Sequence, residues 1–133
     1  MKAIKQYVLQ AVFTLAITLA GSFAASAQVT VQPGSQVFIQ DTIIEFGIIS
    51  MQDSLVKTVS FKNTGKVDFQ WIDAVSECGC ATIILPKKPV KPGRKGEFQI
   101  VFKSPYIGTI EKKITMVSTA GIHYLTYHAY VKE

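Results

Sequence analysis

Short runs in which apolar and polar residues alternate fill most of this chain and limit what it can fold into. Phe98, Ile100 and Phe102 alternate with Glu97, Gln99 and Lys103, and Val59 and Phe61 alternate with polar side chains in the same way. Successive residues of a β-strand point to opposite faces, so this period of two predicts strands with one buried face. No sustained period of 3.6 residues is present, which argues against a helical bundle.

Turn residues separate these runs at the spacing of a sandwich. Glycine, proline, asparagine and aspartate stand between them. We therefore expect an all-β fold, an immunoglobulin-like antiparallel β-sandwich of about seven strands. Asn63-Thr64-Gly65 stands between the runs 57–62 and 67–73 and predicts the tight turn of a hairpin. Trp71 in the second run is interpreted as a core aromatic.

The N-terminus has the features of an export signal. Lys2 and Lys5 precede an apolar run over residues 7–20, and the segment ends in Ala25-Ser26-Ala27. This pattern predicts a signal peptide over residues 1–27 that is cleaved after Ala27. The apolar run is shorter than the roughly 20 residues of a membrane-spanning helix, so we expect no stable membrane insertion after cleavage. The protein is expected to be exported, either periplasmic or secreted, with one sandwich domain over residues 28–133.

A family resemblance rests on several short motifs together. They are Phe46-Gly47 at a strand end, Phe61-Lys62-Asn63-Thr64-Gly65, Cys78-Gly79-Cys80 after a strand, Pro92-Gly93 before the strand with Phe98, and Gly108 before a lysine-rich strand. In this set the chain resembles the bacterial secreted immunoglobulin-like proteins catalogued as domain of unknown function 1573. The resemblance covers nearly all of residues 28–133. It implies an envelope sandwich and assigns no activity.

Cys78 and Cys80 are the only cysteines of the chain. Thiols of exported proteins tend to oxidise, so a local disulfide between these two residues is the favoured interpretation. We expect Gly79 to permit a turn that other residues could not adopt without a large conformational cost. Two unpaired thiols, a redox-exchange pair and a copper site remain as alternatives.

A metal site is not expected, and neither is a cofactor. Two thiolates suffice only for a soft ion such as Cu(I), so any other metal needs further ligands. The candidates are His123, His128, Met51 and Met116. The histidines are five residues apart in one predicted strand, which places them on opposite faces.

Five cations without an acidic residue form the second candidate site. They are Lys87, Lys88, Lys91, Arg94 and Lys95. Of the 14 basic residues in the chain, Lys2 and Lys5 leave with the signal, so 12 stand against 9 acidic ones. Removing these five cations as well leaves a net negative surface. The segment is either a solvated loop with a type II turn at Pro92-Gly93 or a site for an anionic partner, such as an envelope glycan or lipid headgroups. Stacking aromatics do not interleave with the cations, and we expect no nucleic-acid partner.

No sequence motif of an enzyme is present. The chain lacks Gly-x-Ser-x-Gly and His-Glu-x-x-His. Thr42 and Ser54 lie in Asp-Thr-Ile and Asp-Ser-Leu, which resemble bacterial O-glycosylation sites. We therefore expect a non-enzymatic binding or structural module of the cell envelope whose partner is an unknown envelope protein or an anionic glycan. The alternative is a thiol-redox or copper-handling protein that acts through Cys78 and Cys80.

Overall fold

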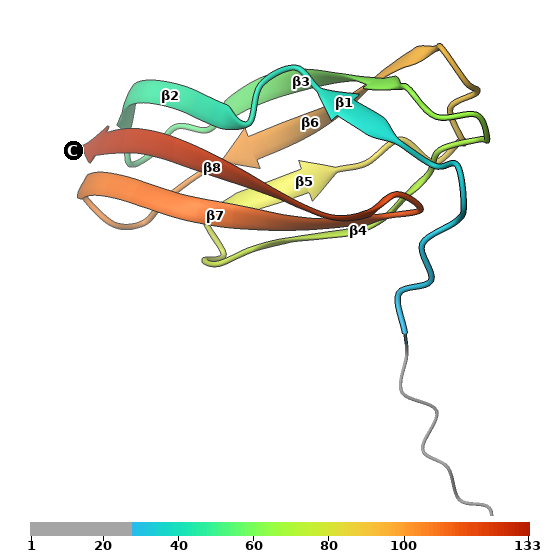
Figure 1. Cartoon of the computed structure of the whole chain (residues 1–133). Coiled ribbons are helices and arrows are strands. Elements are labelled where there is room, and N and C mark those ends of the chain that lie inside the picture. Colours follow the sequence, from blue (N-terminus) through green and yellow to red (C-terminus); the bar gives the residue numbers. More distant parts are fainter. Residues whose placement is uncertain (1–27) are drawn as a thin grey trace, which may run out of the picture.

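The computed structural model describes residues 28–133, which form two stacked β-sheets (Figure 1). The predicted signal peptide, residues 1–27, lies outside the described residues. The eight strands of the described part are β1 (Val37–Ile39), β2 (Ile43–Ser50), β3 (Leu55–Asn63), β4 (Trp71–Ser76), β5 (Ala81–Ile84), β6 (Lys95–Phe102), β7 (Gly108–Ser118) and β8 (Gly121–Lys132). Every regular element in this part of the chain is a strand, which confirms the all-β prediction.

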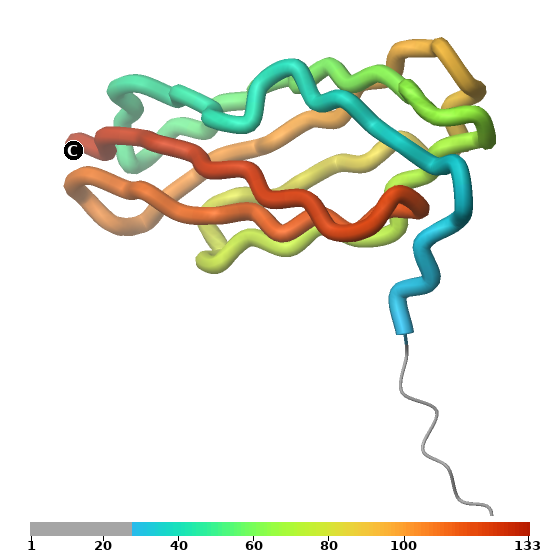
Figure 2. The backbone as a smooth tube through the Cα atoms, in the orientation of Figure 1, coloured from blue at the N-terminus to red at the C-terminus, as the bar shows by residue number. Residues whose placement is uncertain are grey.

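Each sheet has four strands. Sheet A has the order β1-β3-β6-β5, and sheet B has the order β2-β8-β7-β4. All neighbours are antiparallel except β2 and β8, which run parallel side by side (Figure 2). Parallel neighbours need a long crossover between them, and here the chain from β3 to β7 supplies it. The sandwich is confirmed, with this one parallel pair in an otherwise antiparallel arrangement.

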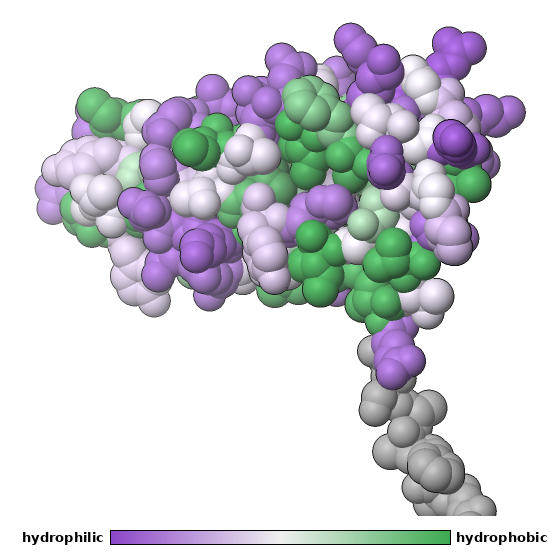
Figure 3. Space-filling model, viewed as in Figure 1, coloured by the Kyte–Doolittle hydropathy of each residue, from purple (hydrophilic) through white to green (hydrophobic). Residues whose placement is uncertain are grey.

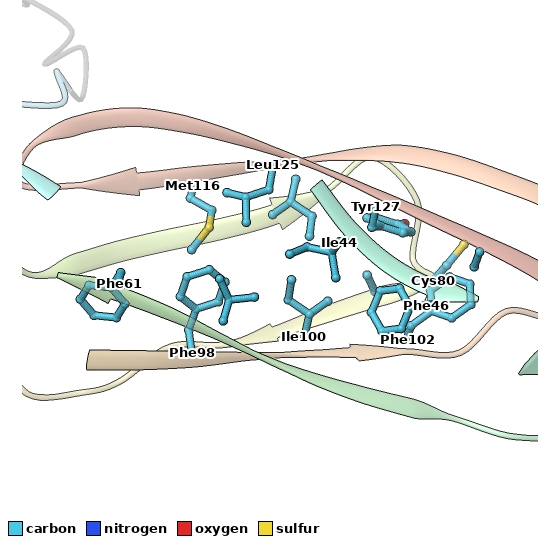
Figure 4. Close-up of a cluster of buried hydrophobic side chains, with 14 of the residues drawn as sticks. Ile44, Phe46, Phe61, Cys80, Phe98, Ile100, Phe102, Met116, Leu125 and Tyr127 are labelled. Carbon is cyan, nitrogen blue, oxygen red and sulfur yellow. The ribbon is translucent and has the colours of Figure 1, made fainter. Parts of the chain in front are cut away.

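Alternate residues of the strands fill the space between the sheets (Figure 4). Phe98, Ile100 and Phe102 from sheet A are at most 1% exposed and lie opposite Leu125 and Tyr127 of sheet B. The buried apolar residues of the core include Val59, Phe61, Phe69, Trp71, Phe98, Ile100, Phe102, Ile114, Met116, Leu125, Tyr127, Ala129 and Val131. Burial of such apolar area is the main force that holds two sheets together.

Trp71 is a core residue, as expected. Its side chain is 4% exposed, and its ring stands perpendicular to that of Phe69, with ring centroids 4.9 Å apart. Perpendicular contacts of this kind are favourable between aromatic rings.

The hairpin predicted at Asn63-Thr64-Gly65 is wrong. The strands on either side of this segment belong to different sheets, β3 to sheet A and β4 to sheet B, so the segment crosses between the sheets. No residue other than glycine has a positive φ among residues 28–133, and Gly65 does not have one either. Asparagine and glycine are common in both kinds of connection, which explains why composition alone could not separate them.

Asn63 holds this crossover together from inside the protein. The side chain is fully buried, and its amide nitrogen donates hydrogen bonds of 2.8 Å to the carbonyl oxygens of Val67 and Val90. Its carbonyl oxygen accepts a hydrogen bond of 2.9 Å from the Gly65 N–H. One buried amide thus satisfies three backbone groups from two loops, which would otherwise be costly to bury.

Gly65 is required because another segment passes very close to it. A Cβ atom at this position would overlap the Gly34 carbonyl oxygen and lie 2.6 Å from the Gln36 nitrogen. The Lys66 N–H also donates to the Gly34 carbonyl oxygen, at 2.9 Å. The glycine therefore lets the segment before β1 pack against the crossover.

Candidate functional site

The turn from β4 to β5 carries both cysteines. Cys78 and Cys80 are joined as a disulfide, with their Cα atoms 5.3 Å apart. This is the arrangement that the sequence favoured for the pair. Cys80 is buried against the core and Cys78 is half-buried. The requirement expected for Gly79 is wrong: its φ is not positive, and a Cβ atom there would meet nothing within 4 Å. The turn uses a conformation that other residues can adopt as well.

A buried tyrosine of β8, in the same sheet as β4, reaches this turn. The Tyr127 hydroxyl lies 3.0 Å from Cys78 Sγ and 3.0 Å from Ser76 Oγ. Burial raises the pKa of Tyr127 above its ordinary value of 10.0, the hydrogen bond from Ser76 opposes this shift and the charge of Glu77 adds to it. The Tyr127 hydroxyl is therefore protonated at neutral pH and can donate a hydrogen bond to the Cys78 sulfur. Sequence reasoning missed this residue, because Tyr127 is 49 residues from Cys78.

The two candidate histidines have side-chain partners other than the cysteines, and Met51 is partly buried against the core. His123 lies on the inner face of sheet B, where its Nε2 is 3.0 Å from Ser118 Oγ, and His128 lies on the outer face, 2.7 Å from Glu45. The expectation that they occupy opposite faces is confirmed. Met116 is fully buried in the core. Among residues 28–133, no three His, Cys, Asp or Glu side chains are grouped so that they could hold a metal ion.

The predicted cationic segment lies at the other end of β5 from the disulfide. Lys87, Lys88, Lys91 and Arg94 belong to the loop between β5 and β6, and Lys95 begins β6. All five side chains are exposed, and within residues 28–133 none has a carboxylate within 4.0 Å. The type II turn is present: Gly93 has a φ of 76°, and the Arg94 N–H donates to the Lys91 carbonyl oxygen. An anion-binding role for the five cations stays a prediction.

The edge of β3 is only partly covered. The short strand β1 pairs with residues 61–63, and no strand of the described chain pairs with the preceding part of β3 on that side. The Ser60 carbonyl oxygen accepts a hydrogen bond from the Gln40 N–H. Backbone groups of an antiparallel strand alternate in direction, so those of Val56 and Thr58 point to the same side, where the edge is open. An open edge of this kind can pair with a further strand.

A hollow of about 240 Å³ lies beside this open edge, between β2 and β3. Ile43 at its border is 60% exposed. The lining combines apolar side chains with charged and polar ones from both sheets: Asp41, Ile43, Ile44, Glu45, Lys57, Thr58 and Val59. The hollow can therefore accept a side chain of a segment that pairs with β3.

Two further observations concern the predicted glycosylation sites and the membrane. Thr42 and Ser54 are both exposed, and their glycosylation stays a prediction. The described residues contain no helix that could span a membrane, since all regular elements there are strands.

Comparison with family models matches residues 37–131 to the family described as protein of unknown function, DUF1573. The chain belongs to this family. The match extends from the start of β1 to Val131 in β8, so it includes the disulfide turn, the cationic loop and the open edge of β3. No curated protein matches the chain in sequence.

Solved structures show the same fold at low sequence identity. A protein of unknown function from Porphyromonas gingivalis W83 aligns with a TM-score of 0.65 and 12% identity over 82% of this chain and 51% of its own. The PapD-like domain 7 of human CEP192 also has a TM-score of 0.65, with 12% identity, 85% of this chain and 97% of its own. A chain of the CsuC–CsuE chaperone–tip adhesion subunit complex of Acinetobacter baumannii has a TM-score of 0.51, with 14% identity, 73% of this chain and 57% of its own. These alignments confirm the immunoglobulin-like β-sandwich fold.

Proposed function

We propose that this protein is an exported, non-enzymatic binding module of the bacterial cell envelope that holds a protein partner by strand addition along β3. One observation carries the proposal: the open backbone edge at Val56 and Thr58 lies beside a hollow that can take a side chain. Backbone hydrogen bonds give affinity in strand addition, and pockets for alternate side chains give specificity. The periplasm or the cell exterior is the compartment that the signal peptide predicts.

The structural neighbours support this proposal. One of them is a chain of a complex between a chaperone and a tip adhesion subunit, so this fold occurs in a protein that binds another protein. The partner we propose is an extended segment with an apolar side chain for the hollow and a free backbone for β3.

A photo-crosslinking experiment in the native envelope tests the proposal. A crosslinking amino acid at Val56 should give protein adducts, whereas the same amino acid at Val101 should give none. Val101 is the matched control, since it lies directly opposite Val56 on the central strand β6. Thr58→Pro removes an N–H from the open side of β3 and should abolish the adducts, because proline cannot donate to an added strand. Adducts that persist in this variant would exclude strand addition at β3.

A second candidate function is thiol–disulfide exchange at Cys78 and Cys80, favoured by the Tyr127 hydroxyl 3.0 Å from Cys78 Sγ. An external dithiol would form a mixed disulfide with one cysteine, and the released sulfur would take up a proton. The second external thiolate would then resolve this mixed disulfide, so the dithiol is oxidised and both cysteines are reduced. Equilibration with dithiothreitol, alkylation and intact mass measurement test the idea; a bridge that stays oxidised at high dithiol concentrations would rule it out.

A further inference from the structure

Three outward side chains form a row across sheet A, at the end where the cationic loop enters β6. Phe38 of β1 is directly opposite Lys62 of β3, and Lys62 is directly opposite Lys95 of β6. All three side chains are exposed, Phe38 by 60%. The row therefore presents one aromatic ring and two ammonium groups on the same face.

The two lysines oppose each other without compensation from an acidic side chain. Side chains directly opposite in an antiparallel pair have Cβ atoms about 4.5–5.5 Å apart, and like charges in this arrangement are destabilising. Within residues 28–133, neither ammonium group has a carboxylate within 4.0 Å. Glu97 is one row away, opposite Ser60, and is also exposed. An external anion between Lys62 and Lys95 would relieve the repulsion.

A hollow of about 310 Å³ lies at this row. Its lining residues are Phe38, Gln40, Ser60, Phe61, Lys62 and Lys95. Small-molecule sites combine apolar or aromatic surface with a few polar groups that fix the orientation of the ligand. In the space-filling view, the surface in the region of β1 and β3 has a hydrophobic area bordered by hydrophilic side chains (Figure 3).

These groups match one class of ligand. An exposed aromatic ring can pack against the C–H face of a sugar ring, the Gln40 amide and the Ser60 hydroxyl can bond to sugar hydroxyls, and paired ammonium groups can hold a carboxylate. An apolar ligand would leave the two lysines unpaired, and a bare inorganic anion would make no use of Phe38.

We propose that this hollow binds an anionic sugar, a hexose unit that carries a carboxylate, as in a uronic acid. The sugar stacks on Phe38, and its carboxylate lies between Lys62 and Lys95. The site is independent of the strand-addition edge at Val56 and Thr58, so the protein has one surface for a protein segment and another for a glycan. Of the five predicted anion-binding cations, Lys95 is the one that lines this hollow.

A titration of the isotope-labelled protein with methyl glucuronide tests the proposal, with the methyl ester of the same sugar as a matched neutral ligand. The glucuronide should shift the amide resonances of Phe38, Lys62 and Lys95, and the ester should bind about tenfold more weakly, the effect of about 1.4 kcal/mol. Lys62→Met and Lys95→Met should each weaken binding of the glucuronide by a similar factor. Lys132→Met, which removes an exposed charge from sheet B, should leave binding unchanged.

Further variants separate the sugar from a bare anion. Phe38→Ala should weaken binding of the glucuronide, and Phe38→Tyr should retain it. Glu97→Gln should strengthen binding about twofold, because it removes a nearby negative charge. Equal affinity for the ester and the acid would overturn the proposal, and so would inorganic phosphate that binds as well as the glucuronide and is insensitive to Phe38→Ala. Thr58→Pro should keep sugar binding, so failure of the strand-addition proposal and failure of this one are distinguishable.

Discussion

The hydroxyl of Tyr127 lies 3.0 Å from Cys78 Sγ, although the tyrosine ring belongs to the core. The ring packs edge-on against Phe46 and Phe102, with ring centroids 6.1 Å and 5.7 Å away. The Cys78 sulfur is therefore in direct contact with Tyr127, a side chain that packs against residues of both sheets. This contact makes the disulfide turn part of the folded core and provides the first prediction.

Tyr127→Phe should make the disulfide harder to reduce. Hydrogen bonds to charged groups contribute about 1.5–3 kcal/mol, so the hydroxyl stabilises a Cys78 thiolate more than a disulfide sulfur. At about pH 9 unperturbed thiols are largely ionised. Tyr127 remains protonated there, because burial raises its pKa above 10.0. The equilibrium constant with dithiothreitol, measured by alkylation and mass, should fall about tenfold. Tyr124→Phe, on the exposed face of the same strand, is the control and should change nothing.

Asn63→Ala should destabilise the protein by about 3 kcal/mol or more, because two buried carbonyls and one N–H lose their partner. Asn63→Asp should cost nearly as much, since a carboxylate cannot donate to Val67 and Val90. Urea denaturation measures both effects. Thr64→Ala, at the exposed neighbouring position, should stay within about 0.5 kcal/mol of wild type. A stable Asn63→Ala protein would show that the crossover does not depend on this amide.

Gly65→Ala should destabilise the protein by about 1–3 kcal/mol, since the added methyl group has to displace the backbone at Gly34 and Gln36. Gly79→Ala should be tolerated within about 0.5 kcal/mol and should still form the disulfide, since its Cβ atom would meet nothing within 4 Å. Thermal unfolding and the intact mass of the oxidised protein test the pair. The reverse order of the two effects would contradict the packing described for the crossover.

His123 should make stability depend on pH. Burial lowers its pKa in the folded state below 6.5, so between the lowered pKa and 6.5 the unfolded chain binds more protons than the folded one. The free energy of unfolding should therefore fall as the pH decreases through this window. Urea midpoints at about pH 7.5 and pH 5 should differ more in wild type than in His123→Gln. His128→Gln, on the outer face, should lose as much stability between these two pH values as wild type does. Equal losses in wild type and His123→Gln would refute the assignment.

The alternation of apolar residues was sufficient to predict the strands and most of the core. Phe98, Ile100 and Phe102 face inward as expected, because a period of two is a direct consequence of strand geometry. Strand pairing was less accessible. Asn63 and Gly65 suit a hairpin turn and an inter-sheet crossover equally well, and only the contacts of the buried amide with Val67 and Val90 decide between them.

The candidate sites were predictable only in part. Two cysteines separated by one residue favour a local disulfide through proximity, whereas Tyr127 is 49 residues from Cys78 in the sequence. Phe38, Lys62 and Lys95 lie on three strands, and their row depends on a register that no local pattern reveals. The same is true of the open edge of β3, which exists because β1 is only three residues long.

The parallel pairing of β2 with β8 also determines when the fold can form during synthesis. β8 is the hydrogen-bonding neighbour of both β2 and β7, so β2 has no partner in sheet B until β8 is made. A chain that appears from its N-terminus must keep Ile44, Phe46 and Ile49 uncovered until residues 121–132 arrive. The sandwich is therefore completed late in synthesis, once residues 121–132 are available to pair with both β2 and β7.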